Sequence, residues 1–251
     1  MKDKLDRVFL ITGAAQGIGW ACAKEAATRG ATIMISDVDA DKGEGRLEEL
    51  KELGAKKARF VRADVSKEED VKRLITSTAE AFGRLDVAVN NAGISGESKP
   101  IGEVSLEDWN KVLGVNLTGV FLCAKHEIQQ MTSQKEGVII NIASILGKVG
   151  FANSGAYVAA KHGVIGLTQN IALEYAKQGV RAIAVGPGFI RTPLLDDNLD
   201  EEELEGIASM HPIGRLGKPE EIAKMVVWLG SEDSSFINGA YFAADGGYLA
   251  Q

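Results

Sequence analysis

Seven short apolar runs alternate with longer segments of helical periodicity along the chain, and this alternation constrains the fold more than any other feature. The runs are nearly continuous in Val, Ile, Leu and Ala, which is typical of parallel strands buried on both faces. Strands that alternate with helices form right-handed crossovers within one sheet. The sequence therefore predicts an α/β fold in which a doubly wound, seven-stranded parallel sheet carries helices on both faces. The expected strands cover residues 8–11, 32–35, 59–61, 85–89, 138–142, 181–185 and 241–243.

Capping signals mark where several of the helices begin. Ser66, followed by Glu69, fits a capping box for a helix that runs to about residue 82. Ser105, followed by Asp108, opens a second helix that runs to about residue 131. Pro219 and the two acids after it suit a first helical turn, where the missing N–H of proline leaves no bond unmade.

The domain organisation follows from what lies between these elements. No linker, repeat or low-complexity tract interrupts the sequence, so residues 1–251 are expected to form a single domain. The longest stretch without clear periodicity covers about residues 189–216. Long irregular segments in compact domains are often active-site lids, and this one is predicted to cover the substrate.

The composition excludes several classes of function. The net charge is −7 and the sequence pI is about 5.2, without a Lys/Arg cluster, which argues against nucleic acid or an anionic membrane as a partner. No run is long enough for a membrane span and none resembles a signal peptide, so a cytoplasmic location is expected. Cys22 and Cys123 are predicted to be small buried hydrophobic residues. The three histidines, His126, His162 and His211, lack metal-ligand spacing, so no catalytic metal is expected.

A glycine-rich turn joins the first strand to the first helix. Residues 12–19 read TGAAQGIG, and the glycines let the backbone turn tightly and approach a pyrophosphate at the helix N-terminus. The spacing differs from the G-x-G-x-x-G fingerprint, so the position after strand one carries the inference. The pattern predicts dinucleotide binding in a Rossmann fold, with contacts from Gly13, Gln16, Gly17, Ile18 and Gly19.

Asp37 ends the second strand, where an acid can accept hydrogen bonds from the adenosine ribose and would repel a 2′-phosphate. Neither residue 36 nor residue 38 is Arg or Lys, and Gln16 places no cation in the glycine turn. The sequence therefore favours NAD over NADP as the cofactor.

Polar and small residues also follow the third and fourth strands, at the sheet edge where open α/β sheets bind ligands. Asp64 and Val65 follow the third strand, and the Asp64 carboxylate could accept from the adenine amino group. The turn after the fourth strand is small enough for a cofactor to lie against its backbone, and it consists of Asn91, Ala92 and Gly93 after Asn90.

Three residues form a candidate catalytic set. Ser144 ends the fifth strand, and Tyr157 and Lys161 share one face of a helix that is expected to begin near residue 156. A nearby ammonium favours phenolate, so Lys161 is expected to lower the pKa of Tyr157. Tyr157 could then act as general acid or base, while Ser144 donates a hydrogen bond to the substrate oxygen.

Together the motifs resemble those of short-chain dehydrogenases/reductases, and the resemblance covers nearly the whole chain. It rests on TGAAQGIG at 12–19, DV at 64–65, NNAG at 90–93, VNLTG around Asn116, Ser144, YVAAK at 157–161, PG at 187–188 with Ile190 and Thr192, and DGG at 245–247. Two departures occur, since Gly186 and Asn238 stand where many members have Asn and Thr. Three residues separate the Tyr and the Lys, unlike the six in enoyl reductases, which argues against double-bond reduction.

The resemblance implies roles for further residues. The matching Ser, Tyr and Lys carry catalysis in that family, and the Lys also holds the nicotinamide ribose. Asn116 matches the position that holds a water continuing the proton relay. Ile190 and Thr192 match positions that contact the nicotinamide carboxamide, beside Pro187 and Gly188. In this family the helices equivalent to residues 107–131 and 157–176 form a contact between subunits, so a homotetramer is expected.

The residues expected around the substrate are largely apolar, which predicts an uncharged secondary alcohol or ketone, such as a cyclic alcohol, diol or hydroxysteroid. They are Ser95, Ser144, Ile145, Leu146, Phe189, Leu194, Leu195 and Met210. One alternative is an NADP-linked reductase of 3-ketoacyl thioesters, which Asp37 disfavours. Another is a catalytically silent NAD-binding regulatory or scaffold protein, which the intact catalytic set disfavours.

Overall fold

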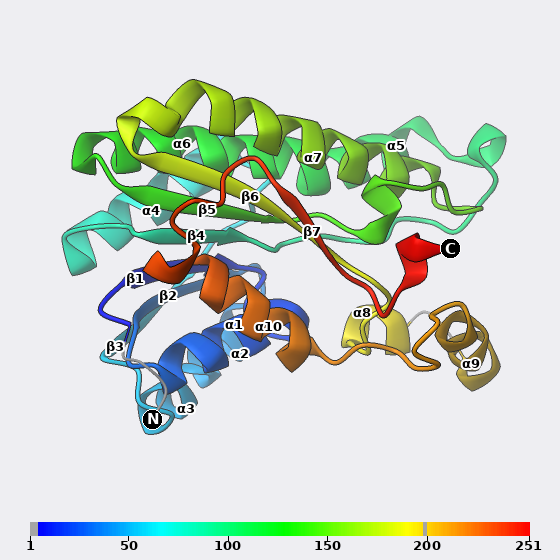
Figure 1. Cartoon of the computed structure of the whole chain (residues 1–251), viewed down its shortest axis with the longest axis horizontal. Coiled ribbons are helices and arrows are strands. Elements are labelled where there is room, and N and C mark those ends of the chain that lie inside the picture. Colours follow the sequence, from blue (N-terminus) through cyan, green and yellow to red (C-terminus); the bar gives the residue numbers. More distant parts are fainter. Residues whose placement is uncertain (1–4, 198–199) are drawn as a thin grey trace.

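The structure, a computed structural model, describes residues 5–197 and 200–251. Its centre is one seven-stranded sheet in the order β3-β2-β1-β4-β5-β6-β7, and every neighbouring pair is parallel. Helices cover both faces (Figure 1). The predicted doubly wound Rossmann-type fold is confirmed. The strands are β1 Val8–Thr12, β2 Thr32–Asp37, β3 Lys57–Arg62, β4 Val87–Asn90, β5 Gly137–Ile142, β6 Val180–Pro187 and β7 Tyr241–Ala244.

Each face of the sheet is covered by its own set of helices. The helices are α1 Gly17–Thr28, α2 Ala40–Gly45, α3 Leu47–Glu52, α4 Glu68–Phe82, α5 Leu106–Leu113, α6 Gly119–Gln134, α7 Gly155–Tyr175, α8 Pro193–Asp196, α9 Glu201–Ser209 and α10 Pro219–Leu229. The layer with α4, α6 and α7 lies above the sheet in Figure 1, and the layer with α1 and α10 lies below it. No helix among the described residues is long and apolar enough to cross a membrane.

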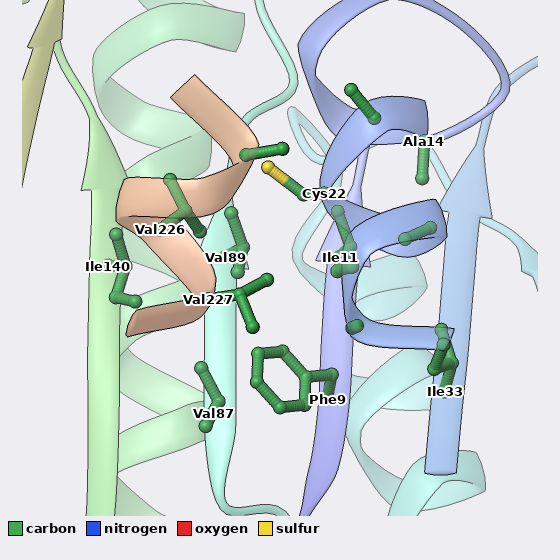
Figure 2. Close-up of a cluster of buried hydrophobic side chains, with 14 of the residues drawn as sticks. Phe9, Ile11, Ala14, Cys22, Ile33, Val87, Val89, Ile140, Val226 and Val227 are labelled. Carbon is green, nitrogen blue, oxygen red and sulfur yellow. The ribbon is translucent and has the colours of Figure 1, made fainter. Parts of the chain in front are cut away.

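Alternate residues of the central strands supply the two hydrophobic cores. Phe9 and Ile11 of β1 point to the side of α1 and α10, whereas Leu10 between them joins the opposite core. Figure 2 shows the first of these cores, with Val227 of α10 near Phe9 and Val226 near Val89. Each fully buried Val, Leu, Ile or Phe side chain contributes about 1.5–3 kcal/mol, so these packed faces hold the sheet in place.

The edges of the sheet differ from the prediction of strands buried on both faces. β3 alternates between exposed and partly buried residues, and β7 is mostly half-buried, because each has a neighbouring strand on one side only. β4 begins at Val87 rather than at residue 85, because the backbone of Leu85 is bonded to the side chain of Gln134.

Two predicted helices differ from the structure. α4 begins after Lys67, without a side-chain cap, because the Ser66 hydroxyl donates to Asp64 Oδ1 at 2.6 Å in a local turn instead. The helix expected from Ser105 to residue 131 is interrupted by a π-helical turn over Gly114–Thr118. The Ser105 cap itself is confirmed, since its Oγ accepts from the backbone N–H of Asp108 at 3.0 Å. Single π-turns are rare in proteins, but those that occur often lie at functional sites.

Candidate active site

The glycine turn and the turn after β4 are locked together. Asn91 Nδ2 donates to the carbonyls of Thr12 and Gly13 at 2.9 and 3.0 Å. The Thr12 hydroxyl in turn accepts from the backbone N–H groups of Asn91 and Ala92 at 3.1 and 3.2 Å. A Cβ on Gly13 would lie 2.8 Å from the Cα of Ala92, so a side chain there would separate the two turns. The predicted cofactor contact of Asn91 stays a prediction, and its bonding partner Thr12 was not predicted from the sequence.

The local structure fits a dinucleotide pyrophosphate. Gln16 is the N-cap of α1, and its side chain makes no capping bond, so the first-turn N–H groups have no side-chain partner among the described residues. Gly17 has φ of +59°, a conformation open to glycine, and its nearest neighbour across the gap is the Thr192 methyl, 3.6 Å from the position of a Cβ. Gly17 therefore faces the predicted lid residue Thr192 across the turn.

Asp37 holds the glycine turn from the side of β2. Its Oδ2 accepts from the backbone N–H of Ala15 at 3.0 Å, and its Oδ1 accepts from that of Asp39 at 3.1 Å. A carboxylate fixed in this way beside the turn has lone pairs left for ribose hydroxyls.

Arg46 is a cation beside the glycine turn, and it was not predicted from the sequence. Its Nε donates to the Ala15 carbonyl at 3.0 Å, its guanidinium lies 4.5 Å from the Trp20 ring centroid, and Nη1 lies 3.6 Å from Glu49. These three contacts hold the guanidinium in place. The signal in the sequence is weak, because Arg46 stands nine residues after Asp37, where no motif places a ligand.

Asp64 and Val65 lie at the end of β3. Asp64 Oδ1 accepts from both the backbone and the hydroxyl of Ser66, and its Oδ2 lies 3.5 Å from Lys67 Nζ. Much of the carboxylate is thus used in the turn, and its predicted contact with adenine stays a prediction. Val65 is buried against α6, where it would meet a Cβ on Gly119 at 2.9 Å.

The three candidate catalytic residues come together at the carboxyl end of β5. Ser144 follows the strand, and Tyr157 and Lys161 stand in the first two turns of α7. The Ser144 side chain lies beside the Tyr157 phenol and favours its ionised form. The buried Lys161 Nζ lies 5.4 Å from the Tyr157 ring centroid and donates to the Ile142 carbonyl at 2.8 Å. The four-residue spacing thus places Tyr157 and Lys161 on one helical face, and β5 brings Ser144 to the same place.

The electrostatics differ from the expected lowering of the Tyr157 pKa. Burial of the phenol raises the pKa of Tyr157, and the neighbouring Ser144 side chain opposes this only in part. Lys161 Nζ does not reverse this shift. Burial also lowers the pKa of Lys161 to about 8. In this geometry the phenol is therefore set up as a proton donor, and its conjugate base forms only at alkaline pH.

Asn116 lies inside the π-helical turn and is fully buried. Its side-chain amide binds both backbone groups of one residue, because Oδ1 accepts from Ile94 N–H at 2.8 Å and Nδ2 donates to Ile94 O at 2.7 Å. The side chain therefore anchors the segment that follows Gly93, next to the predicted cofactor contact. The predicted water relay at Asn116 stays a prediction.

The loop after β6 and the predicted lid lie close to this point. Ile190 pairs with Gly217 across the base of the predicted lid. The lid includes α8 and α9. Its residues 198–199 lie outside the described residues. His211 binds the lid to this loop, because Nε2 accepts from Phe189 N–H at 3.2 Å and Nδ1 lies 3.0 Å from Ile207 O. Pro187 ends β6, and Gly188 packs beside the imidazole.

The predicted substrate residues differ in how far they are buried. Ile145 and Leu146 are buried, whereas Ser95, Leu194 and Met210 are exposed, and Leu195 is partly buried. Phe189 lies in an aromatic cluster that sequence reasoning missed, formed by Phe151, Phe189, His211 and Tyr248, with centroid distances from 5.5 to 5.9 Å. The four rings come from separate segments, so no local pattern could have predicted their contact.

The chain is similar in sequence to known proteins. The sequence matches the profile of the family described as enoyl-(acyl carrier protein) reductase over residues 13–249. Cis-4-hydroxycyclohexanecarboxylate dehydrogenase of Sinomonas cyclohexanicum is 44% identical, with 98% of this chain and 97% of that protein covered. Cyclohexanol dehydrogenase of Acinetobacter sp. (strain SE19) is 42% identical, with 100% and 98% covered.

A solved structure is similar throughout. The crystal structure of levodione reductase superimposes with a TM-score of 0.94 at 38% identity, over 98% of this chain and 99% of that one. The match in sequence, fold and chain length is therefore complete from the glycine turn to the C-terminal segment. The chain belongs to the short-chain dehydrogenase/reductase family.

Proposed function

We propose that the protein transfers a hydride between NAD(H) and a secondary alcohol or ketone on an uncharged ring compound. One observation carries this proposal: the adjacent side chains of Ser144 and Tyr157, with Lys161 beside them, lie at the same sheet edge as the glycine turn. The nicotinamide supplies or accepts the hydride when bound. In ketone reduction Tyr157 donates the proton to the oxygen, and Ser144 donates a hydrogen bond to it.

Asp37 supports NAD as the cofactor. Its carboxylate is fixed beside the glycine turn by Ala15 and Asp39, so a 2′-phosphate brought to this position would meet a negative charge. Arg46, the nearby cation, is already bound to the Ala15 carbonyl and stacked on Trp20. The arrangement therefore favours ribose hydroxyls over a phosphate.

The aromatic cluster supports a ring-shaped substrate. Phe151 follows the loop that contains Ser144, and Phe189 and Tyr248 pack on each other from the other side. Aromatic faces of this kind bind apolar rings by area and by shape. Two of the relatives are named for cyclohexane alcohols, which agrees with this reading.

The function is tested by following NADH formation from NAD with cyclohexanol, a cyclohexane diol, 4-hydroxycyclohexanecarboxylate, a hydroxysteroid, a sugar and an open-chain secondary alcohol. We expect kcat/KM for the best ring alcohol to exceed that of the open-chain alcohol by about tenfold or more. NADP in place of NAD should give the smaller kcat/KM. Turnover only of 3-ketoacyl thioesters with NADPH would favour the reductase alternative, and cofactor binding without any turnover would favour the silent scaffold.

We also propose a homotetramer in the cytoplasm. Large apolar side chains are exposed on the outer helices, with Leu106 of α5 73%, Phe121 of α6 47% and Leu173 of α7 84% accessible. Burial of this face against a second copy would remove them from water. Both cysteines are free and buried, which suits a reducing compartment.

Light scattering at micromolar concentration checks the assembly. We expect a mass of four chains of 26.7 kDa each. The change Leu173→Glu should lower the mass, because it buries a charge in the contact between helices. A monomeric parent protein would contradict the proposal.

A further inference from the structure

Gly186 and Tyr241 occupy one space between β6 and β7. A Cβ on Gly186 would lie 1.9 Å from the Tyr241 hydroxyl oxygen and 2.2 Å from Cζ of the same ring. Any side chain at residue 186 would therefore displace the tyrosine ring. This contact explains why the chain has glycine where many family members have asparagine.

The Tyr241 hydroxyl, on β7, contacts the backbone of Ser144. It donates to the backbone carbonyl of Ser144 at 3.1 Å. Ser144 follows β5, and the last strand residue paired with β6 is Ile142, so strand pairing no longer fixes the carbonyl there. The Ser144 carbonyl otherwise accepts only from Gly147 N–H, at 3.0 Å, among the described residues. The ring is held in place by packing on the small core that contains Ala143 and Ala184.

We propose that Tyr241 is a positioning residue for catalysis: it fixes the backbone of Ser144 from β7 and so aims the serine hydroxyl at Tyr157, in a space that only Gly186 leaves open. This inference rests on the proposed role of Ser144 and Tyr157. Tyr241 acts through Ser144, and its own hydroxyl faces the peptide rather than the reacting atoms.

The change Tyr241→Phe removes the hydroxyl and keeps the ring. We expect kcat to fall about tenfold, the factor that one hydrogen bond of ordinary net strength contributes. The alkaline rise of alcohol oxidation should also move to higher pH, because the neighbouring Ser144 side chain favours the phenolate of Tyr157. Tyr175→Phe, the same change at the far end of α7, is the matched control and should leave both quantities unchanged.

A titration without turnover separates this inference from the proposed function. The protein has four tyrosines, so the absorbance change of Tyr157 is isolated by subtracting the titration of a Tyr157→Phe variant. This difference is measured in the parent background and in the Tyr241→Phe background. We expect the pKa of Tyr157 to be higher in the second, whatever the substrate is. An unchanged Tyr157 pKa together with an unchanged pH profile would overturn the inference, and a lack of turnover with every alcohol would count only against the proposed function.

The shared space gives a second test. Gly186→Ala should lower both kcat and the unfolding temperature, because the new Cβ expels the ring. In a Tyr241→Ala background the same substitution should cost much less, since every atom nearest to that Cβ belongs to the Tyr241 side chain. Equal effects of Gly186→Ala in the two backgrounds would show that the two residues do not share this space, and would overturn the inference.

Discussion

Replacing Tyr157 with Phe is expected to lower kcat for alcohol oxidation and ketone reduction by a factor of about 10²–10⁴, the range typical of a lost general acid or base. The substitution removes the hydroxyl beside Ser144 and leaves the ring that faces Lys161. Because the reacting oxygen then has no proton donor, the loss should appear in kcat. Steady-state kinetics with the best ring alcohol and its ketone measure this effect.

Cofactor binding provides the control for this variant. NADH binding, followed by fluorescence, should change little, since Asp37 and the glycine turn are untouched. Tyr175→Phe, at the other end of α7, should keep full activity. A Tyr157→Phe enzyme that retained more than about a tenth of the parent kcat would contradict the general acid–base role.

The same residue sets the direction of the pH dependence. Burial raises the pKa of Tyr157, so the phenolate that oxidation requires forms only at alkaline pH. We therefore expect kcat for oxidation to rise with pH across the neutral range and that for reduction to fall at high pH. An oxidation rate that is flat from acid to alkaline pH would show that another group takes the proton.

Replacing Glu127 with Gln is expected to remove a large pH dependence of stability. Glu127 of α6 is fully buried, and its Oε2 accepts from Asn90 Nδ2 at 3.0 Å. The same Nδ2 donates to Asn141 Oδ1, and Asn141 Nδ2 donates to the Thr168 hydroxyl. Burial raises the pKa of Glu127 from 4.5 to about 8, so the folded protein holds this carboxyl protonated at neutral pH.

The sign of the effect follows from proton uptake. Between pH 4.5 and about 8 the folded state binds a proton at Glu127 that the unfolded state has released, so stability falls as pH rises through this window. Each unit of pKa difference is worth about 1.4 kcal/mol, which gives a loss of roughly 3–5 kcal/mol across the window. Glutamine stays neutral and keeps the shape of the side chain, so the variant should lose much less.

Urea unfolding at pH 5 and pH 8.5 measures this difference at one protein concentration. The parent should lose several kcal/mol more than Glu127→Gln between the two values. Glu107→Gln, a change at an exposed residue of α5, is the matched control and should behave like the parent. An equal loss in the parent and the Glu127 variant would show that the buried carboxyl is already ionised in the folded protein.

The structure explains which helix predictions held. The caps at Ser105 and Pro219 are local, because each depends on residues within one turn, and both lie where the sequence places them. The capping box at Ser66 is equally local but failed, because Asp64 competes for the same hydroxyl. The π-turn around Asn116 has no signal in the periodicity, since it adds a single residue to the turn of an otherwise regular helix.

The sequence by itself determined the layered sheet, the glycine turn and the alignment of Tyr157 with Lys161. These features depend on strand and helix periods and on short spacings, which are encoded locally. Only the tertiary structure decided that Tyr241 supports Ser144, that four aromatic rings meet beside the lid, and that burial raises the pKa of Tyr157. These contacts join residues far apart in the chain, and a pKa depends on desolvation and on where a charge is bound, so neither can be derived from spacing.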